Sequence, residues 1–280
     1  MTPESRRPVD GGRIRRSGSA RFLLLALIAS LLGCVDEQQE QKLGNSLAAD
    51  LNEHLPLIQD PQTSAYVDSM GSALARVSSR PGLDYEFYVI NSNVVNAFAL
   101  PGGHIYITRG LIERTRSGTE LAGVLAHEIG HVAARHGVQK LERELRTGSL
   151  VGLLYNLFLG GEPELLRRQP LELAGTLWSA RHSRQDEAEA DRLAVKYLID
   201  AGVNPDGIIT LFQELLEEEA SDPRLAQEWF STHPLTASRI ASVKREIADA
   251  GQPDLQWKTE FPAYGAFLRR LQALPILTLP

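Results

Sequence analysis

The run His127-Glu128-Ile129-Gly130-His131 combines residue types and spacing that could do chemistry. A helix turns by about 100° per residue, so His127 and His131 lie on one face and can bind one Zn²⁺. Glu128 can then act as a base toward a water held by that metal. The alternative is an exposed amphipathic helix that carries two histidines by chance. We favour the metal site, because ionisable side chains on a buried helix are costly unless they are bonded or metallated.

The flanking residues predict that this run lies on a buried helix. Ser117 followed by Glu120 resembles a capping box, and Gly137 is typical of a stop after the last turn. Apolar residues recur between these ends at helical spacing: Leu121, Val124, Leu125, Ile129 and Val132. We therefore expect the two histidines on a helix that packs into the core.

A catalytic zinc usually takes three protein ligands and keeps one position open for water, so a third ligand is expected. In the metzincin pattern it is a histidine six residues beyond the second, but Gly137 occupies that place. That class is therefore excluded. His136 is half a turn away from the metal face on a continuing helix, and we interpret it as a structural residue or a surface donor.

A helix rich in carboxylates is predicted over 183–201. Its apolar stripe consists of Ala190, Leu193, Ala194, Tyr197, Leu198 and Ala201. Glu187 falls about 40° from the centre of this stripe and can face the core, whereas Glu189, about 120° away, faces water. Asp191 is on the side of Glu187 and could orient a ligating imidazole, while Asp186 is interpreted as an N-terminal cap. The alternative is that all four carboxylates only favour the positive end of the helix.

A further histidine, His233, stands between Thr232 and Pro234, ahead of a predicted helix that contains Arg239. A histidine before a proline that starts a helix is held stiffly. It could donate a hydrogen bond to the oxyanion of a tetrahedral intermediate, or bind zinc in a resting form. Taken alone, the segment favours capping or packing over such a role.

Helices and short strands must position these side chains. Helical spacing is seen in residues 36–60, where a polar tether runs into a helix, and in residues 62–77. Three strands are predicted before the histidine helix: Tyr85–Ile90, Val94–Leu100 and His104–Thr108, the last two joined by a Pro-Gly-Gly turn. Almost everything after that helix is predicted to be helical. We expect an α+β fold, mostly helical, with a small antiparallel sheet beside the histidine helix.

Two later segments leave alternatives open. Leu150–Leu159 is too short to cross a membrane, and we interpret it as a core helix or hairpin. It could instead be a mobile cover over the site or a surface that dips into lipid. Residues 261–274 are a possible helix, and the tail that follows could dock on the domain or on a partner.

The first 33 residues have the pattern of a targeting segment, with six arginines before an apolar core over 22–32. The lone Cys34 follows Leu31-Leu32-Gly33, which resembles the lipobox of bacterial lipoproteins. The resemblance implies cleavage before Cys34 and lipid attachment to its thiol. An ordinary signal peptide or an uncleaved anchor is the alternative. Val35 favours the outer membrane, because the inner-membrane retention signal typically has Asp there.

The charge balance excludes nucleic acid as a partner. The chain has 29 Lys/Arg and 35 Asp/Glu, of which six and two lie in the first 33 residues. The remaining 23 basic and 33 acidic residues give a net charge of −10. No basic or aromatic cluster offsets this charge.

Four motifs occur in order along the chain: Asn96–Gly103, the run 127–131, Glu187 to Asp191 as ExxxD, and Thr232-His233-Pro234 with Arg239. Through this set, from about Gly44 to Ile247, the chain resembles the gluzincin metallopeptidases of family 48. That group contains the CAAX prenyl proteases and periplasmic lipoproteins of outer-membrane protein quality control. The chain lacks the multiple membrane spans of the prenyl proteases and the helical repeats of the larger quality-control members, so CAAX processing is not expected.

The resemblance implies roles at the matching positions. One Zn²⁺ per chain would be bound by three residues: His127, His131 and Glu187. Glu128 would be the general base, and Asp191 would support a histidine. His233 would stabilise the transition state or occupy the open position of the zinc. The strand residues Asn96, Ala97, Phe98 and Ala99 would form the edge to which an extended substrate adds by backbone hydrogen bonds.

These implications together predict a zincin-like metallopeptidase with four segments. They are a lipoprotein signal peptide (1–33), a lipidated tether and N-terminal helix (34–60), a zinc metallopeptidase domain (61–250) and a C-terminal extension (251–280). We expect an endopeptidase that cleaves exported or misfolded envelope proteins at the periplasmic face of the outer membrane, with the outer-membrane assembly machinery as a partner. The alternative is a zinc-containing, chaperone-like lipoprotein that binds clients and whose proteolysis is latent.

Overall fold

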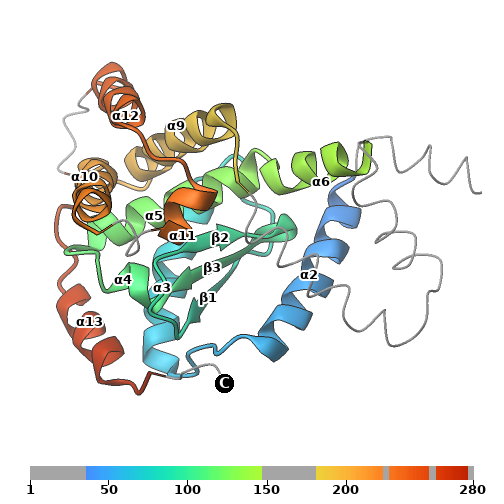
Figure 1. Ribbon diagram of the computed structural model, residues 1–280, viewed down its shortest axis with the longest axis horizontal. Helices are drawn as coiled ribbons and strands as arrows, with labels where there is room; N and C mark the ends of the chain where they lie inside the picture. The colour runs from blue at the N-terminus through green and yellow to red at the C-terminus, as the bar shows by residue number, and fades with distance from the viewer. Residues whose placement is uncertain (1–35, 147–180, 223–226, 252–256, 277–280) are drawn as a thin grey trace, which may run out of the picture. The chain divides into compact units, whose positions relative to one another are not determined.

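Three short strands and a set of helices around a central helix make up the part of the chain that the structure describes (Figure 1). The computed structural model describes residues 36–146, 181–222, 227–251 and 257–276. The predicted signal peptide, Cys34 and Leu150–Leu159 lie outside these residues. The fold is α+β and mostly helical, as predicted.

The described helices are, in chain order, α2 (Glu37–His54), α3 (Pro61–Ala75), α4 (Arg109–Ile112), α5 (Gly118–Ala133), α6 (His136–Arg146), α9 (Arg184–Asp200), α10 (Asp206–Ser221), α11 (Gln227–Thr232), α12 (Ala237–Asp249) and α13 (Tyr264–Ala273). The strands are β1 (Glu86–Ile90), β2 (Ala97–Ala99) and β3 (His104–Thr108), and a short 3₁₀ helix, η1 (Pro101–Gly103), joins β2 to β3. None of the helices in the described ranges has both the length and the apolar character needed to span a bilayer.

The sheet is mixed, so the predicted antiparallel sheet is wrong. Its strand order is β1-β3-β2, with β2 antiparallel to β3 and β1 parallel to β3. The tight turn at η1, where Gly102 and Gly103 have positive φ values of 82° and 105°, returns the chain directly from β2 to β3. This turn fixes only the pairing of β2 with β3. Nothing in the spacing of β1 indicates that it pairs with β3, which is the more distant of the two strands in the sequence.

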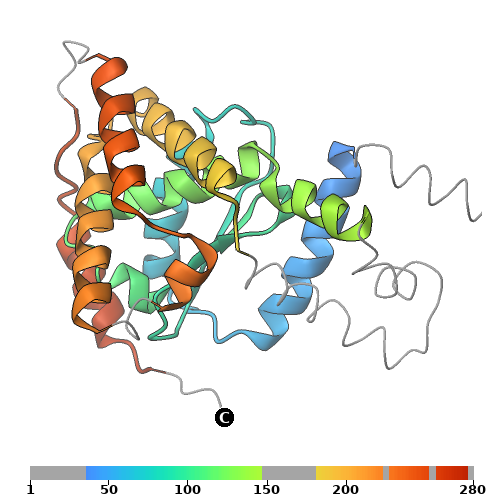
Figure 2. The ribbon, with the colours of Figure 1, turned by 45° about the horizontal axis from the view of Figure 1, so that its top comes forward.

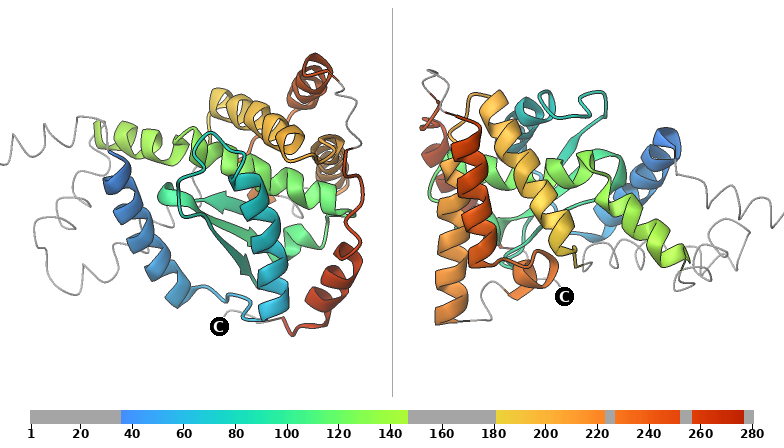
Figure 3. Two further views of the ribbon diagram at one scale, coloured as in Figure 1. Left: turned by 180° about the vertical axis from the view of Figure 1, so that it is seen from behind. Right: turned by 90° about the horizontal axis from the view of Figure 1, so that it is seen from above.

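The two faces of the sheet are covered by different helices. Side chains alternate along β3, so that Ile105 and Ile107 pack in the main core with α3 and α5, while Tyr106 packs on the opposite face. Leu47 and Leu51 of α2 cover that opposite face. Figure 3, left, shows α3 crossing the sheet.

Helix α2 begins earlier than predicted. Asp36 and Gln39 form a capping box, so the polar segment that was expected to be a tether is helical from Glu37. The buried carboxylate of Glu40 binds Arg80 and Arg135 at 2.9 and 2.8 Å. Polar side chains of this segment therefore help to dock α2 on the domain.

Helix α5 is the centre of the molecule, between the sheet and α9, and it also packs on α10 (Figure 2). Ser117 caps its first turn as predicted, but the Glu120 carboxylate accepts a hydrogen bond from Arg116 N instead of completing the box. The predicted stop at Gly137 is wrong. The helix ends at Ala133, because Arg135 turns the chain with a φ of 61°, and Gly137 belongs to the first turn of α6.

Candidate metal centre

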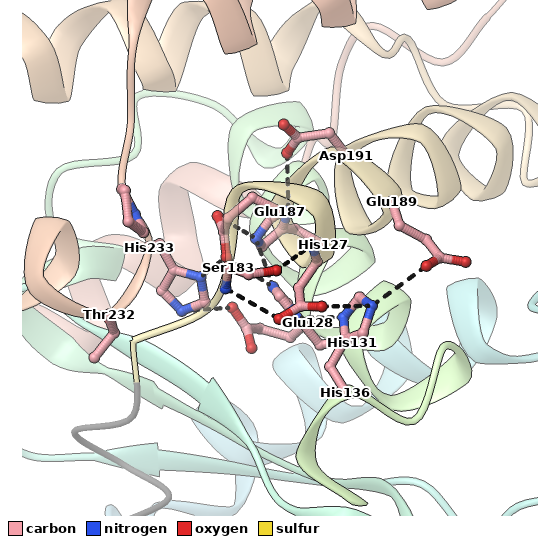
Figure 4. Close-up of polar contacts among 12 residues, drawn as sticks. His127, Glu128, His131, His136, Ser183, Glu187, Glu189, Asp191, Thr232 and His233 are labelled. Carbon is pink, nitrogen blue, oxygen red and sulfur yellow. Dashed lines mark hydrogen bonds and ion pairs between the residues drawn. The ribbon is translucent and has the colours of Figure 1, made fainter. Parts of the chain in front are cut away.

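Three segments bring the predicted site residues together (Figure 4). Helix α5 carries both histidines and the glutamate of the 127–131 run, α9 carries Glu187 and Asp191, and His233 directly follows α11. His127, Glu128, Glu187 and His233 are all 0% exposed. Among the described residues, His127, His131, Glu187 and His233 form a group whose ligand atoms lie within 4.8 Å of one another.

The distances within this group fit one tetrahedral metal ion. His127 Nε2 lies 3.1 Å from His131 Nε2, and Glu187 oxygens lie 3.4 Å from the His131 nitrogen and 3.6 Å from the His127 nitrogen. Ligand atoms about 2.0–2.1 Å from a tetrahedral zinc are separated by roughly 3.3 Å. Two imidazole nitrogens and a carboxylate are also the donor types that zinc prefers in proteins, so the residues fit the ion.

The electrostatics of the site keep His131 and Glu187 in the forms that bind metal. Burial holds the pKa of His131 well below its ordinary value, so its imidazole is neutral. Burial alone would raise the pKa of Glu187, but the nearby His233 and hydrogen bonds from His131 and His233 hold that pKa well below its ordinary value. Neutral imidazole and ionised carboxylate are the species that coordinate a cation.

Asp191 contacts His127 on the side away from the metal group. Its Oδ1 lies 3.1 Å from His127 Nδ1, which leaves Nε2 directed at the other ligands. Arg239 of α12 donates to both oxygens of Asp191 at 2.7 and 2.8 Å and also pairs with Glu187. Although burial opposes ionisation, hydrogen bonds from His127 and Arg239 lower the pKa of Asp191. One guanidinium therefore fixes the carboxylates of both Glu187 and Asp191.

Glu128 has an environment that suits a proton carrier. Among the described residues, neither of its carboxylate oxygens makes a hydrogen bond, and the nearest partner is His233 Nε2 at 3.6 Å. Burial raises the pKa of Glu128 above its ordinary value. A buried carboxylate without hydrogen bonds is costly, which indicates that its normal partner is a molecule bound in the site.

His233 contacts both Glu187 and the sheet. Its Nδ1 is 3.2 Å from Glu187 Oε1, and its Nε2 is 3.3 Å from the carbonyl oxygen of Ala97. The prediction that Pro234 starts the next helix is wrong, because α12 begins at Ala237 and is capped by Thr236. His233 is held instead by α11, since its N–H donates to Trp229 O at 2.7 Å and its ring stacks on Trp229.

The residues predicted to bind substrate lie on and just before β2, at one edge of the sheet. Asn96 and Ala97 are fully buried, and Phe98 packs on the face covered by α2. The Asn96 backbone is fixed by Thr108, whereas its side-chain Nδ2 makes no hydrogen bond among the described residues. His104, at the start of β3, lies within hydrogen-bond distance of Asn45.

Two histidines near the site were not recognised from the sequence. His136 was interpreted as structural or as a surface donor, but it is 1% exposed and its Nδ1 lies 2.9 Å from His131 Nδ1. The periodicity argument fails there because α5 has already ended. His182, half-buried, has its ring 4.0 Å from that of His131. Its position directly before the Ser183 cap of α9, one turn from Glu187, is the signal that could have revealed it.

Two other predictions for α9 are confirmed. Asp186 forms a capping box with Ser183, and Glu189 is exposed, with 49% of its side chain accessible. Glu187, by contrast, is fully buried, as its position near the apolar stripe predicted.

A mostly helical α+β fold and a buried group of two histidines and a glutamate, with a second glutamate beside them, define a zinc metallopeptidase. The model of peptidase family M48 matches residues 61–247, and the chain belongs to this family.

Relatives with this domain come from bacteria and mitochondria. The chain is 32% identical over 214 residues to the beta-barrel assembly-enhancing protease of Escherichia coli K12, which covers 74% of this chain and 43% of that protein. It is 31% identical over 198 residues to the mitochondrial metalloendopeptidase OMA1 of Schizosaccharomyces pombe, covering 67% of this chain and 56% of the relative. It is 26% identical to the metalloprotease YcaL of E. coli K12, covering 67% and 74%. The match thus spans less than half of the first relative.

Proposed function

We propose that this chain is a zinc-dependent endopeptidase that cleaves exported or misfolded proteins of the bacterial cell envelope. The observation that carries the proposal is the Glu128 carboxylate, buried without a hydrogen-bond partner among the described residues, beside a His-His-Glu group with the spacing of a zinc site. The relatives named as proteases support the same reaction.

In this proposal His127, His131 and Glu187 hold the metal, and Asp191 fixes the ring of His127. Zinc bound there would supply a Lewis acid that polarises the scissile carbonyl and activates a water. Glu128 takes a proton from the water that attacks the peptide carbonyl. It then passes this proton to the leaving amine nitrogen. Burial raises the pKa of Glu128, and a carboxylate with a higher pKa is the stronger base for the first of these two transfers.

We propose that an extended substrate pairs with β2, through Asn96, Ala97, Phe98 and Ala99. An edge strand offers backbone groups to an added strand. The Ala97 carbonyl oxygen lies next to His233, so a peptide paired there passes directly over the metal group. The Nδ2 of Asn96, which lacks a partner among the described residues, could donate to that peptide.

The location and partners belong to the same proposal. The lipobox-like sequence before Cys34 supports a signal peptide and a lipid anchor, and Val35 supports the periplasmic face of the outer membrane. A relative named for enhancing beta-barrel assembly supports a link to the outer-membrane assembly machinery. We retain the segments 1–33, 34–60, 61–250 and 251–280 as the proposed organisation.

The position of His233 favours a second candidate, a client-binding lipoprotein whose proteolysis is latent. His233 belongs to the same group of ligand atoms as the two α5 histidines and Glu187. A fourth protein ligand would close the position that water needs. In this form the protein would hold unfolded envelope proteins and cleave them only after His233 moves.

The test of the proposed function is Glu128→Gln, with Glu120→Gln on the same helix as the control. We expect Glu128→Gln to keep one zinc per chain and to lose cleavage of an unfolded substrate such as casein by at least about 10²-fold, since the general base is gone. Glu120→Gln should cleave at the normal rate. Unchanged cleavage by Glu128→Gln would refute the mechanism. Crosslinking of the inactive variant in the native envelope would then identify its clients.

A further inference from the structure

A second group of titratable side chains lies beside the metal centre, on the far side of His131. It consists of His136 at the start of α6, His182, and two carboxylates of α9, Asp186 and Glu189. His136 is 1% exposed, and Figure 4 shows it beside Glu189. The proposed mechanism uses none of these four side chains.

We infer that His136 is a positioning residue, which accepts a hydrogen bond from the zinc ligand His131 and so fixes that ligand's ring and tautomer. The inference rests on the proposed zinc site. Its geometric basis is the 2.9 Å contact between His131 Nδ1 and His136 Nδ1. It makes His136 the counterpart of Asp191, which lies 3.1 Å from the Nδ1 of the other ligand, His127.

The direction of this hydrogen bond follows from the chemistry of the ligand. The Nε2 of His131 faces the metal group and must be unprotonated to bind zinc, so the proton of its ring is on Nδ1. His136 Nδ1 must then accept, which places the proton of the His136 ring on Nε2. That nitrogen lies 3.5 Å from a Glu189 oxygen and 3.9 Å from an Asp186 oxygen. The chain of contacts therefore runs from the metal ligand to a carboxylate at the surface.

The backbone conformation at Arg135 supports a positioning role for His136. Arg135 is the only residue other than glycine with positive φ among the described residues, at 61°. This conformation is unfavourable in an L-residue. It ends α5 and turns the chain so that His136, the next residue, faces back onto His131. A strained residue beside a functional side chain is a common device for placing that side chain.

An imidazole suits this position better than a carboxylate. The site already contains three buried acidic residues, Glu128, Glu187 and Asp191. Another buried anion would add repulsion, whereas a neutral imidazole accepts the hydrogen bond without adding charge. We therefore expect an uncharged acceptor at position 136 to be sufficient.

The test measures zinc affinity by competition with a chelator, in the Glu128→Gln background so that neither activity nor autolysis enters the result. His136→Asn keeps an acceptor at the position of Nδ1, because Asn Oδ1 is as many bonds from Cα as His Nδ1. His136→Gln places its polar atoms one bond further out, and His136→Leu has none. We expect His136→Asn to bind zinc within about threefold of the parent protein and the other two variants to bind about 10–100-fold more weakly. Equal affinity in all the proteins, or equal loss in all three variants, would refute the inference.

Two further measurements do not depend on how well the variants fold. In the zinc-loaded parent protein, the long-range ¹H–¹⁵N NMR spectrum should show His136 as the Nε2–H tautomer, and an Nδ1–H form would refute the inference. Zinc titration should give one ion per chain. Two ions, falling to one in His182→Ala, would instead assign His131, His136 and His182 to a second metal site. If the parent protein binds no zinc, the proposed function itself fails. If it binds zinc but His136 is the Nδ1–H tautomer, only the role inferred for His136 fails.

Discussion

Glu187 is the side chain that connects the parts of the site. It faces both α5 histidines, contacts His233 at 3.2 Å and pairs with Arg239. A buried carboxylate with so many cationic or hydrogen-bonding partners stays ionised, which is why its pKa is well below the ordinary value. Because Arg239 also binds Asp191 through two hydrogen bonds, the proposed ligand Glu187 and the residue proposed to orient His127 share one anchor.

His233 is the residue whose removal best separates the active and latent forms. Its Nδ1 is as close to Glu187 as the Nε2 atoms of His127 and His131 are, which is the basis of the proposal that it closes the metal group at rest. We expect His233→Ala to cleave an unfolded substrate at least about tenfold faster than the parent protein. This holds if the form in which His233 leaves the metal position open makes up a tenth or less of the resting population. The initial rate of casein cleavage at saturating zinc measures this.

A matched control is His104→Ala, which removes another buried histidine whose bonds are to Asn45 and Glu86, away from the metal group. This variant should not accelerate cleavage. A fall in the rate of His233→Ala by about 10²–10³-fold would contradict the resting cap and assign His233 to transition-state stabilisation.

At the residue scale, the sequence predicts best what helical periodicity controls. The pairing of His127 with His131 and the burial of Glu187 follow from spacing within a single helix. Periodicity says nothing beyond the end of a helix. His136 is the first residue after the turn at Arg135, and His182 lies two residues before α9, so their contacts with His131 depend on tertiary structure.

At the element scale, the site depends on how closely α5 approaches α9, because these two helices carry the proposed ligands His127, His131 and Glu187. Gly130 lies at the crossing, where a Cβ atom would be 2.9 Å from Ala190 O and 3.2 Å from Ala190 Cα. Both of these atoms belong to the backbone and cannot rotate away. The glycine inside the histidine run is therefore a packing requirement, which its spacing alone did not reveal.

We expect Gly130→Ala to destabilise the protein by about 1–3 kcal/mol and to weaken zinc binding, because the added methyl group pushes the two helices apart. Urea unfolding and chelator competition measure the two effects. Gly265→Ala in α13 is the control, since Gly265 is exposed and its Cβ would meet only the flexible end of Arg269 at 3.4 Å. It should be stabilising by up to about 1 kcal/mol, because alanine favours helix. Stability gained in both variants would contradict the close-packing argument.

The same scale shows why the strand pairing could not be predicted. Alternation located the strands to within three residues, and the glycine turn fixed β2 against β3. The parallel pairing of β1 with β3 depends on which side of β3 the first strand occupies. The position of β1 depends on the packing of α2, α3 and α5 on the two faces of the sheet. No local sequence pattern indicates this packing.

At the scale of the whole molecule, α13 contacts segments of the described domain that are far apart in the chain. The predicted helix over 261–274 is confirmed as α13, and it docks on the domain. Arg109 donates to the carbonyl oxygens of Gln272 and Leu274, and the Tyr264 hydroxyl bonds Thr115. Arg270 binds both oxygens of Asp60, the N-cap residue of α3, at 2.5 and 2.6 Å. Residues 210 positions apart in the chain are thus joined beside the core.

The Asp60–Arg270 pair makes part of the stability depend on pH. Hydrogen bonds from Arg270 and then from Thr63 lower the pKa of Asp60 below the value of about 3.9 expected in the unfolded chain. A group whose folded pKa is depressed stabilises the fold fully at pH values above the unfolded pKa, and this contribution is lost as the pH falls toward the folded pKa. Asp60→Asn keeps a good N-cap and removes the charge. We therefore expect it to lower Tm at pH 7, and we expect the difference from the parent protein to narrow as the pH falls from about 4 to about 3.

Thermal melts at several pH values measure this difference, and Asp68→Asn, at an exposed aspartate of the same helix, is the control. The Arg270 side chain is 43% exposed, so salt should reduce the effect as well. Arg270→Gln should reproduce both the loss at pH 7 and its decrease in acid, because it removes the other half of the same pair. A Tm difference that stays constant from pH 7 to about 3 would contradict the contribution of the charged Asp60–Arg270 pair.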